Sequence, residues 1–306
     1  MAQPDNTTKS FADKLLSIKR ETLFLILFLG TMIPQFFTVQ LPNEPAESAI
    51  DLFRELNAIP EGGTVIIQSD WTNSTRGESR GQFDALIRIL MRRNVKFAIM
   101  SVADNQSPQV ARDVVEKINA ERVLANEQPY KKWEHWVNLG FFPNAEGIGQ
   151  AMRADIRAAF KGKRDTNSSG QQDDVFNSPV LSKVKEVGDL DALIVVTGTK
   201  SIIIALERLG SQVKMLGMVT GVMGPETLNY YNSKQLKGLS AGLKGVYDME
   251  TMMEKGVEGV PGFPGKKNMD KGTRYIFTLH IAITIMVLAV IIGNVGTIMK
   301  KRGGAA

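Results

Sequence analysis

Polar residues follow the ends of five apolar runs that the sequence predicts to be strands. The first run, TVIIQSD, ends at Asp70, and the second, VKFAIMSV, is followed by Asp104. Ligands of parallel α/β sheets bind beyond the carboxyl ends of the strands, so these residues could line a pocket. Two carboxylates there could hold a divalent cation or serve as acid and base. Acids at strand ends also cap turns, and this interpretation stays open.

A Thr-Gly-Thr-Lys-Ser turn follows the fourth run and opens a helical segment. Backbone N–H groups at such a helix start can bind an anion, and the lysine could add positive charge. Capping of the helix by Thr199 explains the same residues without a ligand. The candidate ligand-binding residues combine this turn with the two acids and with the threonine that ends the fifth run. They are Asp70, Asp104, Thr197, Gly198, Thr199, Lys200, Ser201 and Thr220.

The sequence points to no reaction. It contains no cysteine, which excludes thiol catalysis and thiolate metal sites. Neither GxGxxG nor GxxxxGK[ST] occurs, and there is no GxSxG elbow. His135, between Trp133 and Trp136, suits either stacking on an aromatic ligand or a buried structural corner, and we favour the corner. One histidine with no second nitrogen ligand nearby makes a poor metal site. We therefore predict no catalytic residue, no metal and no cofactor.

The elements that must position these residues alternate along the middle of the chain. Strand-like runs separated by amphipathic segments predict βαβ units and a mainly parallel, Rossmann-like sheet flanked by helices. Residues 161–177 have turn-forming composition and predict a long surface loop, and residues 224–256 predict two helices. The predicted strands cover residues 64–70, 95–102, 136–142, 192–198 and 212–220, and the helices between them cover 46–59, 83–93, 107–125, 146–160 and 201–210.

Two strongly apolar stretches frame this domain. Residues 21–41 and 271–299 each contain an apolar run long enough to cross about 30 Å of hydrocarbon as a helix. Pro34 is expected to kink the first near its outer end. The first stretch could also be a signal peptide, since Ala46 and Ser48 are small residues at a conceivable cleavage spacing. We favour an uncleaved anchor, which gives a two-pass membrane protein with its α/β domain at residues 42–270.

The basic residues beside the spans suggest an orientation. Lys9, Lys14, Lys19 and Arg20 precede the first span, and only Arg54 lies in the stretch just after it. This asymmetry predicts a cytoplasmic N-terminus, although the second span is flanked by similar charge on both sides. Two crossings then place tails 1–20 and 300–306 in the cytoplasm and the domain outside. Tail 1–20 is expected to be either an amphipathic interfacial helix or a frayed polar leader.

Three polar residues of the second span, His280, Thr284 and Asn294, share one helix face within roughly 80°. Polar groups in lipid tend to face other helices. An intramembrane histidine also suggests a proton relay, but residues 275–299 contain no Asp, Glu, Lys or Arg as a partner. We predict that the three residues pack against another helix.

The distribution of net charge along the chain indicates which classes of partner the protein can bind. The net charge is +5, and most of the excess lies in the two tails, which leaves the middle of the chain nearly neutral. A nucleic-acid-binding domain concentrates positive charge on a folded face. We therefore expect a lipid bilayer and other membrane proteins as partners, and no nucleic acid.

Three tracts carry a resemblance to a known family. VNLGFF at Val137, QLKGLSAGLKGVYDME at Gln235 and the pair Met269-Asp270 resemble uncharacterised prokaryotic two-pass membrane proteins with a Rossmann-like soluble domain. Only QLKGLSAGLKG is distinctive, and the following Val246-Tyr247-Asp248 departs from the family pattern. The resemblance implies the architecture and a prokaryotic cytoplasmic membrane, and it transfers no catalytic residue.

Three functions remain as hypotheses from the sequence. The leading one is a membrane-anchored structural or interaction protein that forms homo- or hetero-oligomers through its membrane helices and its α/β domain. The second is an extracytoplasmic ligand-binding or sensor subunit that uses the carboxyl edge of the sheet. The third, a membrane-bound hydrolase or transferase, would require Asp70 or Asp104 for its reaction.

Overall fold

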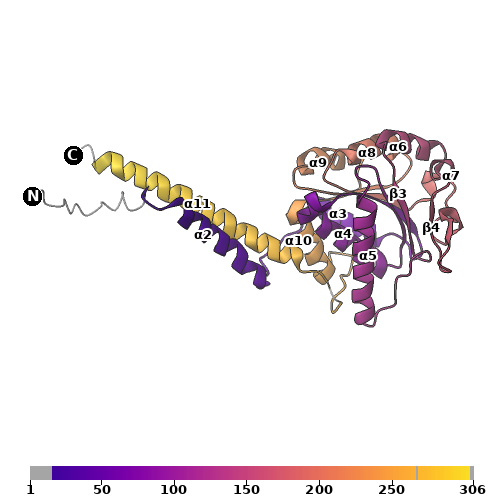
Figure 1. Ribbon diagram of the computed structural model, residues 1–306, viewed down its shortest axis with the longest axis horizontal. Coiled ribbons are helices and arrows are strands. Elements are labelled where there is room, and N and C mark those ends of the chain that lie inside the picture. Colours follow the sequence, from indigo (N-terminus) through magenta and orange to yellow (C-terminus); the bar gives the residue numbers. More distant parts are fainter. Residues whose placement is uncertain (1–15, 267, 304–306) are drawn as a thin grey trace, which may run out of the picture. The chain divides into compact units, whose positions relative to one another are not determined.

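The computed structural model describes residues 16–266 and 268–303. The chain forms two compact units. Residues 42–272 make up one unit, which we call the α/β domain (Figure 1). The other, which we call the helix pair, combines residues 16–41 with residues 273–303.

A six-stranded sheet forms the centre of the α/β domain. Its strands lie in the order β3-β2-β1-β6-β7-β8, and every pair is parallel. Without the separate β4–β5 hairpin, this order is the doubly wound, Rossmann-like one, with its switch point between β1 and β6. The strands are β1 (Thr64–Asp70), β2 (Lys96–Ser101), β3 (Trp136–Phe141), β6 (Ala192–Thr197), β7 (Met215–Val219) and β8 (Gly238–Ala241).

Helices cover both faces of the sheet, which explains why its strands are apolar throughout. Along β1, Val65 and Ile67 belong to one hydrophobic cluster and Ile66 to the other, because successive side chains point to opposite faces. The first cluster includes residues of α3 (Glu47–Asn57), α4 (Arg76–Arg92), α5 (Ser107–Leu124) and α10 (Gly242–Lys255). The second includes residues of α6 (Ala145–Ala154), α7 (Ile156–Ala159), α8 (Ser201–Leu209) and α9 (Gly224–Asn232).

The five strands predicted from the sequence are confirmed, but a sixth was missed. The stretch 224–256 contains β8 between its two helices. Glycine weakens a strand, so Gly-Leu-Ser-Ala gives no strand signal. Tertiary packing requires the glycine, because a Cβ on Gly238 would collide with the backbone of Leu52 on α3.

The predicted loop 161–177 is also more ordered than expected. It contains the antiparallel hairpin β4 (Arg164–Thr166) and β5 (Gln172–Asp174), followed by a short 3₁₀ helix, η3 (Val175–Asn177). The helix predicted over 146–160 is interrupted at Asp155. The Asp155 carboxylate accepts hydrogen bonds from the N–H groups of Arg157 and Ala158 and so caps α7.

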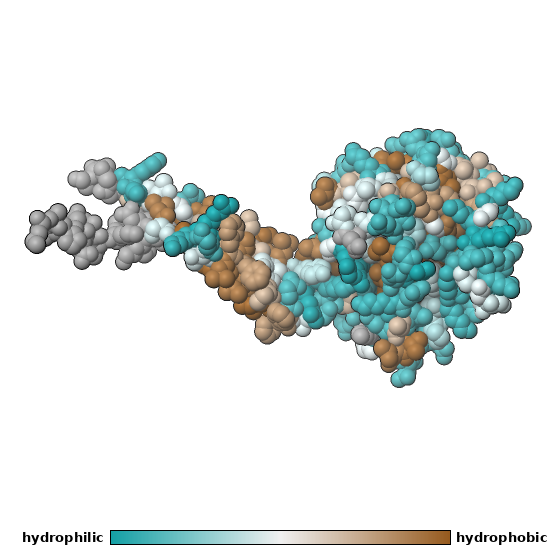
Figure 2. Space-filling model, in the orientation of Figure 1, coloured by the Kyte–Doolittle hydropathy of each residue, from teal (hydrophilic) through white to brown (hydrophobic). Residues whose placement is uncertain are grey.

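In the helix pair, the C-terminal helix α11 (Lys271–Gly303) is long and apolar enough to cross a membrane. The N-terminal helix is shorter than predicted. Helix α2 (Arg20–Met32) ends before Pro34, and a 3₁₀ turn, η1 (Ile33–Phe36), and extended chain follow. Proline lacks the N–H that an α-helix needs, which explains this end. Figure 2 shows hydrophobic residues along both helices.

Hydrogen bonds and close packing join α11 to the N-terminal segment of the helix pair. The Gln35 side-chain amide donates to the Thr278 hydroxyl at 2.8 Å. Gly30 lies so close to Ile285 that a Cβ at position 30 would overlap the isoleucine side chain. Most of the predicted amphipathic tail 1–20, and residues 304–306 of the basic tail, lie outside the described residues.

Candidate functional sites

Asp70 ends β1 at the switch point, and protein groups occupy both of its carboxylate oxygens. Its Oδ1 accepts hydrogen bonds from the Ser101 hydroxyl (2.8 Å) and from the N–H groups of Val102 (2.7 Å) and Ala103 (3.3 Å). Its Oδ2 accepts from the Gln68 side-chain amide at 2.6 Å. The side chain is buried. These bonds tie the end of β1 to the end of β2, which is a structural task.

Asp104 has a separate local role. It is half-buried after β2, and its Oδ1 accepts from the N–H of Gln106 at 2.7 Å. This bond shapes the turn that leads into α5. The two acids therefore have different hydrogen-bond partners, and the geometry favours the turn-capping interpretation over a shared cation or an acid–base pair.

The turn after β6 satisfies its own polar groups. The Thr197 hydroxyl lies 3.0 Å from the hydroxyls of both Thr199 and Ser201, and it accepts from the N–H of Thr199. The Thr199 hydroxyl accepts from the N–H of Ser201 at 3.3 Å, but the cap residue of α8 is Lys200, and no side chain caps this helix. Lys200 is exposed and pairs with Glu226 at 3.2 Å.

The neighbouring chain packs closely against this turn. A Cβ on Gly198 would lie 3.0 Å from the Thr75 methyl and 3.1 Å from the Thr220 methyl, so little space remains beside it. The backbone N–H of Thr220 donates to Thr197 O at 3.1 Å. The structure brings these predicted residues together as a packed edge of the sheet.

Sequence reasoning missed two α4 residues at this edge. The buried Gln82 amide donates to Val219 O at 2.7 Å, at the end of β7. The Glu78 carboxylate accepts from the N–H of Gly221 at 2.6 Å. The sequence feature that could have indicated close packing of α4 is Gly81. Because Gly81 has no side chain, Val246 of α10 can approach α4. Two buried atoms near this edge, Trp71 Nε1 and Ser79 Oγ, have no hydrogen-bond partner among the described residues.

His135 occupies a structural corner before β3. Its Nδ1 accepts from the N–H of Lys131 at 3.0 Å, and its ring lies 4.5 Å from that of Tyr130. Over residues 16–266 and 268–303, no group of three or more potential ligand side chains could hold a metal ion.

A surface hollow of about 560 Å³ lies away from the predicted site. Its walls come from the end of α6, α7, the 3₁₀ turn η4 (Val187–Asp189) and Gln212. Arg157, one of its lining residues, donates to the carbonyl oxygens of Ser182 and Val184, so its guanidinium is already engaged. None of the candidate ligand-binding residues lines this hollow.

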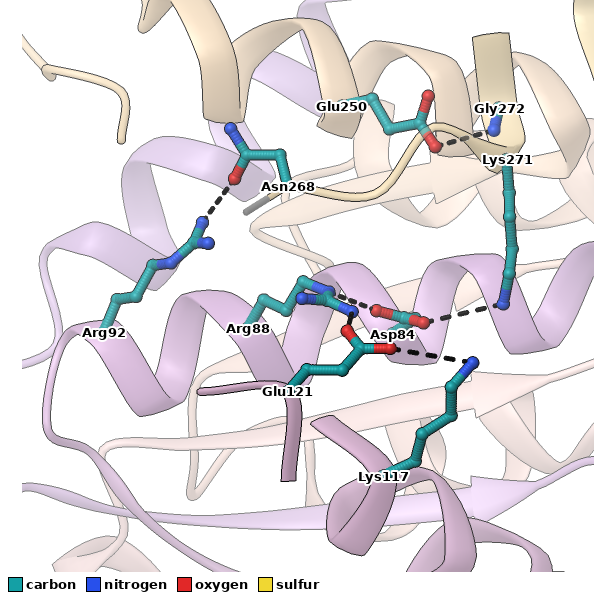
Figure 3. A network of polar contacts seen from close by, with 9 residues as sticks. All are labelled: Asp84, Arg88, Arg92, Lys117, Glu121, Glu250, Asn268, Lys271 and Gly272. Atoms are coloured by element: carbon teal, nitrogen blue, oxygen red, sulfur yellow. Dashed lines mark hydrogen bonds and ion pairs between the residues drawn. The ribbon is translucent and has the colours of Figure 1, made fainter. Parts of the chain in front are cut away.

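Charged side chains link α4 to α5 in a cluster that we call the ionic seam (Figure 3). Arg88 is buried; its Nε lies 2.5 Å from Asp84 Oδ1, and its Nη2 lies 2.6 Å from Glu121 Oε2. Burial works to lower the pKa of Arg88, but the two carboxylates outweigh it and raise that pKa. Lys117 lies 3.7 Å from Glu121 at the exposed side.

The chain segment that leads into α11 and includes its first two residues lies against this seam and against α10. We call residues 268–272 the strap. Arg92 donates to Asn268 Oδ1 at 2.5 Å, and Asn268 Nδ2 donates to Glu254 at 2.6 Å (Figure 3 draws the first). Met269 is buried in the first hydrophobic cluster. Burial lowers the pKa of Arg92 to about 10, so this anchor lies in a partly desolvated environment.

The last two strap residues are held by acids of two different helices. Lys271 Nζ lies 3.6 Å from Asp84 Oδ2 of α4. The N–H of Gly272 donates to Glu250 Oε1 of α10 at 2.6 Å. Both residues also begin α11. No pattern in the sequence indicates this arrangement, because its residues come from three separate segments.

The polar residues of α11 face away from α2. His280, Thr284 and Asn294 are exposed, whereas Ile285 and Ala289 are half-buried. At about 100° per residue, Ile285 and Ala289 lie about 140° and 180° from His280 around the helix. The Thr284 hydroxyl donates to His280 O within its own helix, and no hydrogen bond among the described residues involves the Asn294 side chain. The packing partner predicted for this face is therefore not α2.

Comparison with protein-family models, with curated proteins and with solved structures found no match. The resemblance carried by QLKGLSAGLKG therefore stays a prediction. That tract contains β8 and the beginning of α10, and α10 carries the acid that holds Gly272.

Proposed function

We propose that the protein is a membrane-anchored structural or interaction protein that assembles into oligomers through α11 and the α/β domain. One observation carries the proposal: the face of α11 with His280, Thr284 and Asn294 is exposed and lies away from α2. Polar side chains in hydrocarbon are costly unless another helix or a water-filled cavity covers them. A second copy of α11, or the helix of a related subunit, provides that cover.

The proposal includes two membrane crossings. Helix α2 has 13 residues, which is about 20 Å at 1.5 Å per residue, and the 4 residues of η1 add about 8 Å. Together they approach the hydrocarbon thickness of about 30 Å. The packing of Gly30 against Ile285 and the Gln35–Thr278 hydrogen bond support a paired crossing. Both tails then lie in the cytoplasm of a prokaryotic cell, and the domain lies outside its inner membrane.

Cysteine cross-linking in native membranes tests the assembly, because the chain contains no cysteine of its own. Thr284→Cys lies on the polar face, and Met286→Cys, about 200° around the helix, is a matched control at nearly the same depth. Met286 is exposed in the chain, so both sites are accessible. We expect an oxidised dimer for T284C and at least about fivefold less for M286C. Equal yields, or no adduct from T284C, would contradict the proposal.

The topology has its own test. Ser211, an exposed residue of the domain, and Lys301, beyond the apolar part of α11, are each replaced by cysteine. In intact cells, a membrane-impermeant maleimide should label S211C but not K301C. Labelling of K301C, or protection of S211C, would reverse or abolish the proposed orientation.

A second candidate function is ligand binding at the carboxyl edge of the sheet. The observation that favours it is the pair of buried, unpartnered polar atoms Trp71 Nε1 and Ser79 Oγ beside the switch point. Thermal-shift measurements with inorganic phosphate and nucleotides test it, because a ligand that binds the folded state raises the melting temperature. No shift with any of these probes would remove this candidate. We do not propose a hydrolase or transferase, because the oxygens of Asp70 already accept four hydrogen bonds and Asp104 accepts the turn N–H of Gln106.

A further inference from the structure

The surface hollow of about 560 Å³ lies at the edge of the α/β domain where the strands of the sheet begin. Its wall η4 ends just before β6 starts at Ala192, and Gln212 lies shortly before the start of β7 at Met215. The candidate ligand-binding residues lie at the opposite, carboxyl edge, which is the usual ligand site of parallel sheets. The hollow is therefore separate from that edge.

The break between α6 and α7 shapes one wall of the hollow. Residues 152–157, on both sides of the break, line the hollow without a gap. Asp155 is extended, with φ −161° and ψ 105°, so the chain leaves the course of α6 before α7 begins. An unbroken helix would present only every third or fourth residue to one side. The break thus brings both buried and exposed side chains of one short run to the same hollow.

The floor of the hollow is apolar. Met152, Ile156 and Val187 line it, and all three are buried members of the second hydrophobic cluster. Because a packed interior deforms little, these side chains form a fixed surface. The volume of the hollow falls within the range of about 300–1,000 Å³ that is typical of small-molecule sites. A ligand in the hollow can therefore place an apolar part on this floor.

The exposed lining carries positive charge that the protein itself does not pair. Both acids of the lining have local structural tasks, because Asp155 caps α7 and Glu186 belongs to a capping box of η4. In contrast, no hydrogen bond or ion pair within the described part of the chain involves the side chains of Arg153 or Lys185. Two cations without partners beside an apolar floor favour a ligand with a negative charge.

Arg157 adds a third cation whose position is fixed. Its Nε donates to Val184 O at 2.9 Å, its Nη2 donates to Ser182 O at 2.8 Å, and its guanidinium lies 4.9 Å from the ring centroid of Phe176. Its Nη1 makes no hydrogen bond to any described residue. A guanidinium that is already held in place loses little conformational freedom when it binds a carboxylate.

We propose that this hollow is a binding site for a small organic anion that consists of a carboxylate attached to an apolar body. The apolar body lies on the buried floor, and the carboxylate lies among the three basic side chains. The site goes beyond the proposed assembly and does not depend on it. It also leaves the carboxyl edge of the sheet unoccupied, so the two candidate ligand sites can be tested separately.

A cysteine in the hollow reports its charge, because the chain has no cysteine of its own. Gln212→Cys lies in the lining, and Ser211→Cys, the exposed residue next to it, lies outside the lining and is the matched control. Both full-length proteins, in phosphatidylcholine nanodiscs, react with an anionic and with a cationic methanethiosulfonate. We expect the anionic-to-cationic rate ratio to be at least about fivefold higher for Q212C than for S211C, since unpaired cations concentrate anions locally.

Substitution of the two unpaired cations completes this arm of the experiment. Arg153→Gln with Lys185→Gln changes exposed residues and should bring the rate ratio of Q212C down to that of S211C. The difference between the two cysteines should also shrink in about 1 M salt, because salt screens exposed charges. Equal rate ratios for Q212C and S211C in the parent background at low salt would overturn the proposed site.

Protection from labelling tests the ligand class with three defined probes. A ligand as small as benzoate is expected to bind with a dissociation constant of about 1 mM, so about 10 mM benzoate should slow labelling of Q212C at least about fivefold. The same concentration should leave S211C unaffected and should not protect Q212C in the R153Q/K185Q background. Benzamide, which lacks the charge, and inorganic phosphate, which lacks the apolar body, should protect much less. Absence of protection by benzoate, or equal protection by either of the other probes, would overturn the proposal.

Discussion

Asp248 and Glu250 lie two residues apart on α10, and each accepts a backbone N–H from a different end of the α/β domain. Asp248 Oδ2 accepts from Ala46 at 3.1 Å, and Glu250 Oε1 accepts from Gly272 at 2.6 Å. Both acids are buried. One turn of one helix therefore fixes the points where the chain enters and leaves the domain.

Replacement of Asp248 tests this anchoring role. Asp248 also accepts from Asn43 at 3.0 Å and pairs with Lys244. Asp248→Ala removes a buried acceptor with several donors, and we expect a loss of about 2 kcal/mol in the free energy of unfolding. Limited proteolysis should also cut the entering segment at residues 42–46 faster. Glu258→Ala, at an exposed residue, is the control and should change stability by less than about 0.5 kcal/mol. Equal effects of the two substitutions would refute the anchoring role.

The two acids of the predicted pocket should differ in what they stabilise. Asp70→Asn places an amide where the carboxylate accepts four hydrogen bonds, so at least one buried donor loses its acceptor. We expect a loss of about 2–3 kcal/mol. Asp104→Ala removes one exposed turn bond and should cost about 1 kcal/mol or less. Thermal unfolding followed by circular dichroism gives both values, and an Asp70→Asn protein as stable as the parent would show that Asp70 is not structural.

The sequence predicted the α/β fold well because its strongest signals are local. The run from Thr64 to Asp70 was predicted with the bounds that the structure has, since a short β-branched run between polar turns has little alternative. Strand β8 could not be predicted, because its glycine weakens the local strand signal. That glycine is needed because the backbone of Leu52, nearly two hundred residues earlier in the chain, lies against it. Long-range packing overrides local propensity at such positions.

The sequence predicted where the candidate site residues lie, but it did not predict which groups they contact. The residues after β1 and β6 do come together at the switch point, as the topology rule requires. Their hydrogen-bond partners could not be foreseen, because Gln82 and Glu78 reach the sheet edge from α4. The contacts of the strap could not be predicted for the same reason, because Asp84, Glu250 and Gly272 are distant in sequence.

Tyr130 should make stability sensitive to alkaline pH. Its hydroxyl donates to Val95 O in the core, and burial raises the pKa of this phenol well above its usual value near 10. The folded state therefore keeps the proton while the unfolded state releases it. The stabilising effect is complete below pH of about 10 and is lost as pH rises toward the folded-state pKa. Denaturant unfolding between pH 9 and 11.5 should show this loss, and Tyr130→Phe should show a shallower dependence. An identical pH dependence in both proteins would contradict the assignment.

Packing within the helix pair predicts that a branched side chain at position 30 of α2 is unfavourable. Gly30 lies against Ile285, whereas a Cβ on Gly293 of α11 would meet no atom within 4 Å. Gly30→Val should therefore separate the helices, and Gly293→Ala should not. Cysteines at Gln35 and Thr278, whose side chains are hydrogen-bonded, report the separation through their disulfide yield in membranes. We expect the yield to fall severalfold with G30V only. Equal yields in the two backgrounds would contradict the observed packing.

Two glycines of the α/β domain allow a test of why glycine occurs at each position: one lies against the backbone of a neighbouring helix, and the other has open space around it. A Cβ on Gly238 would overlap the Leu52 backbone, whereas a Cβ on Gly77 in the first turn of α4 would meet no atom within 4 Å. Gly238→Ala must push β8 away from α3 and should cost about 2–3 kcal/mol. Gly77→Ala should stabilise the protein by up to about 1 kcal/mol, since alanine loses less conformational entropy in a helix. Opposite shifts of the melting temperature are expected. If Gly238→Ala left the melting temperature unchanged or raised it, the edge strand β8 would not need the contact with α3 that explains its glycine.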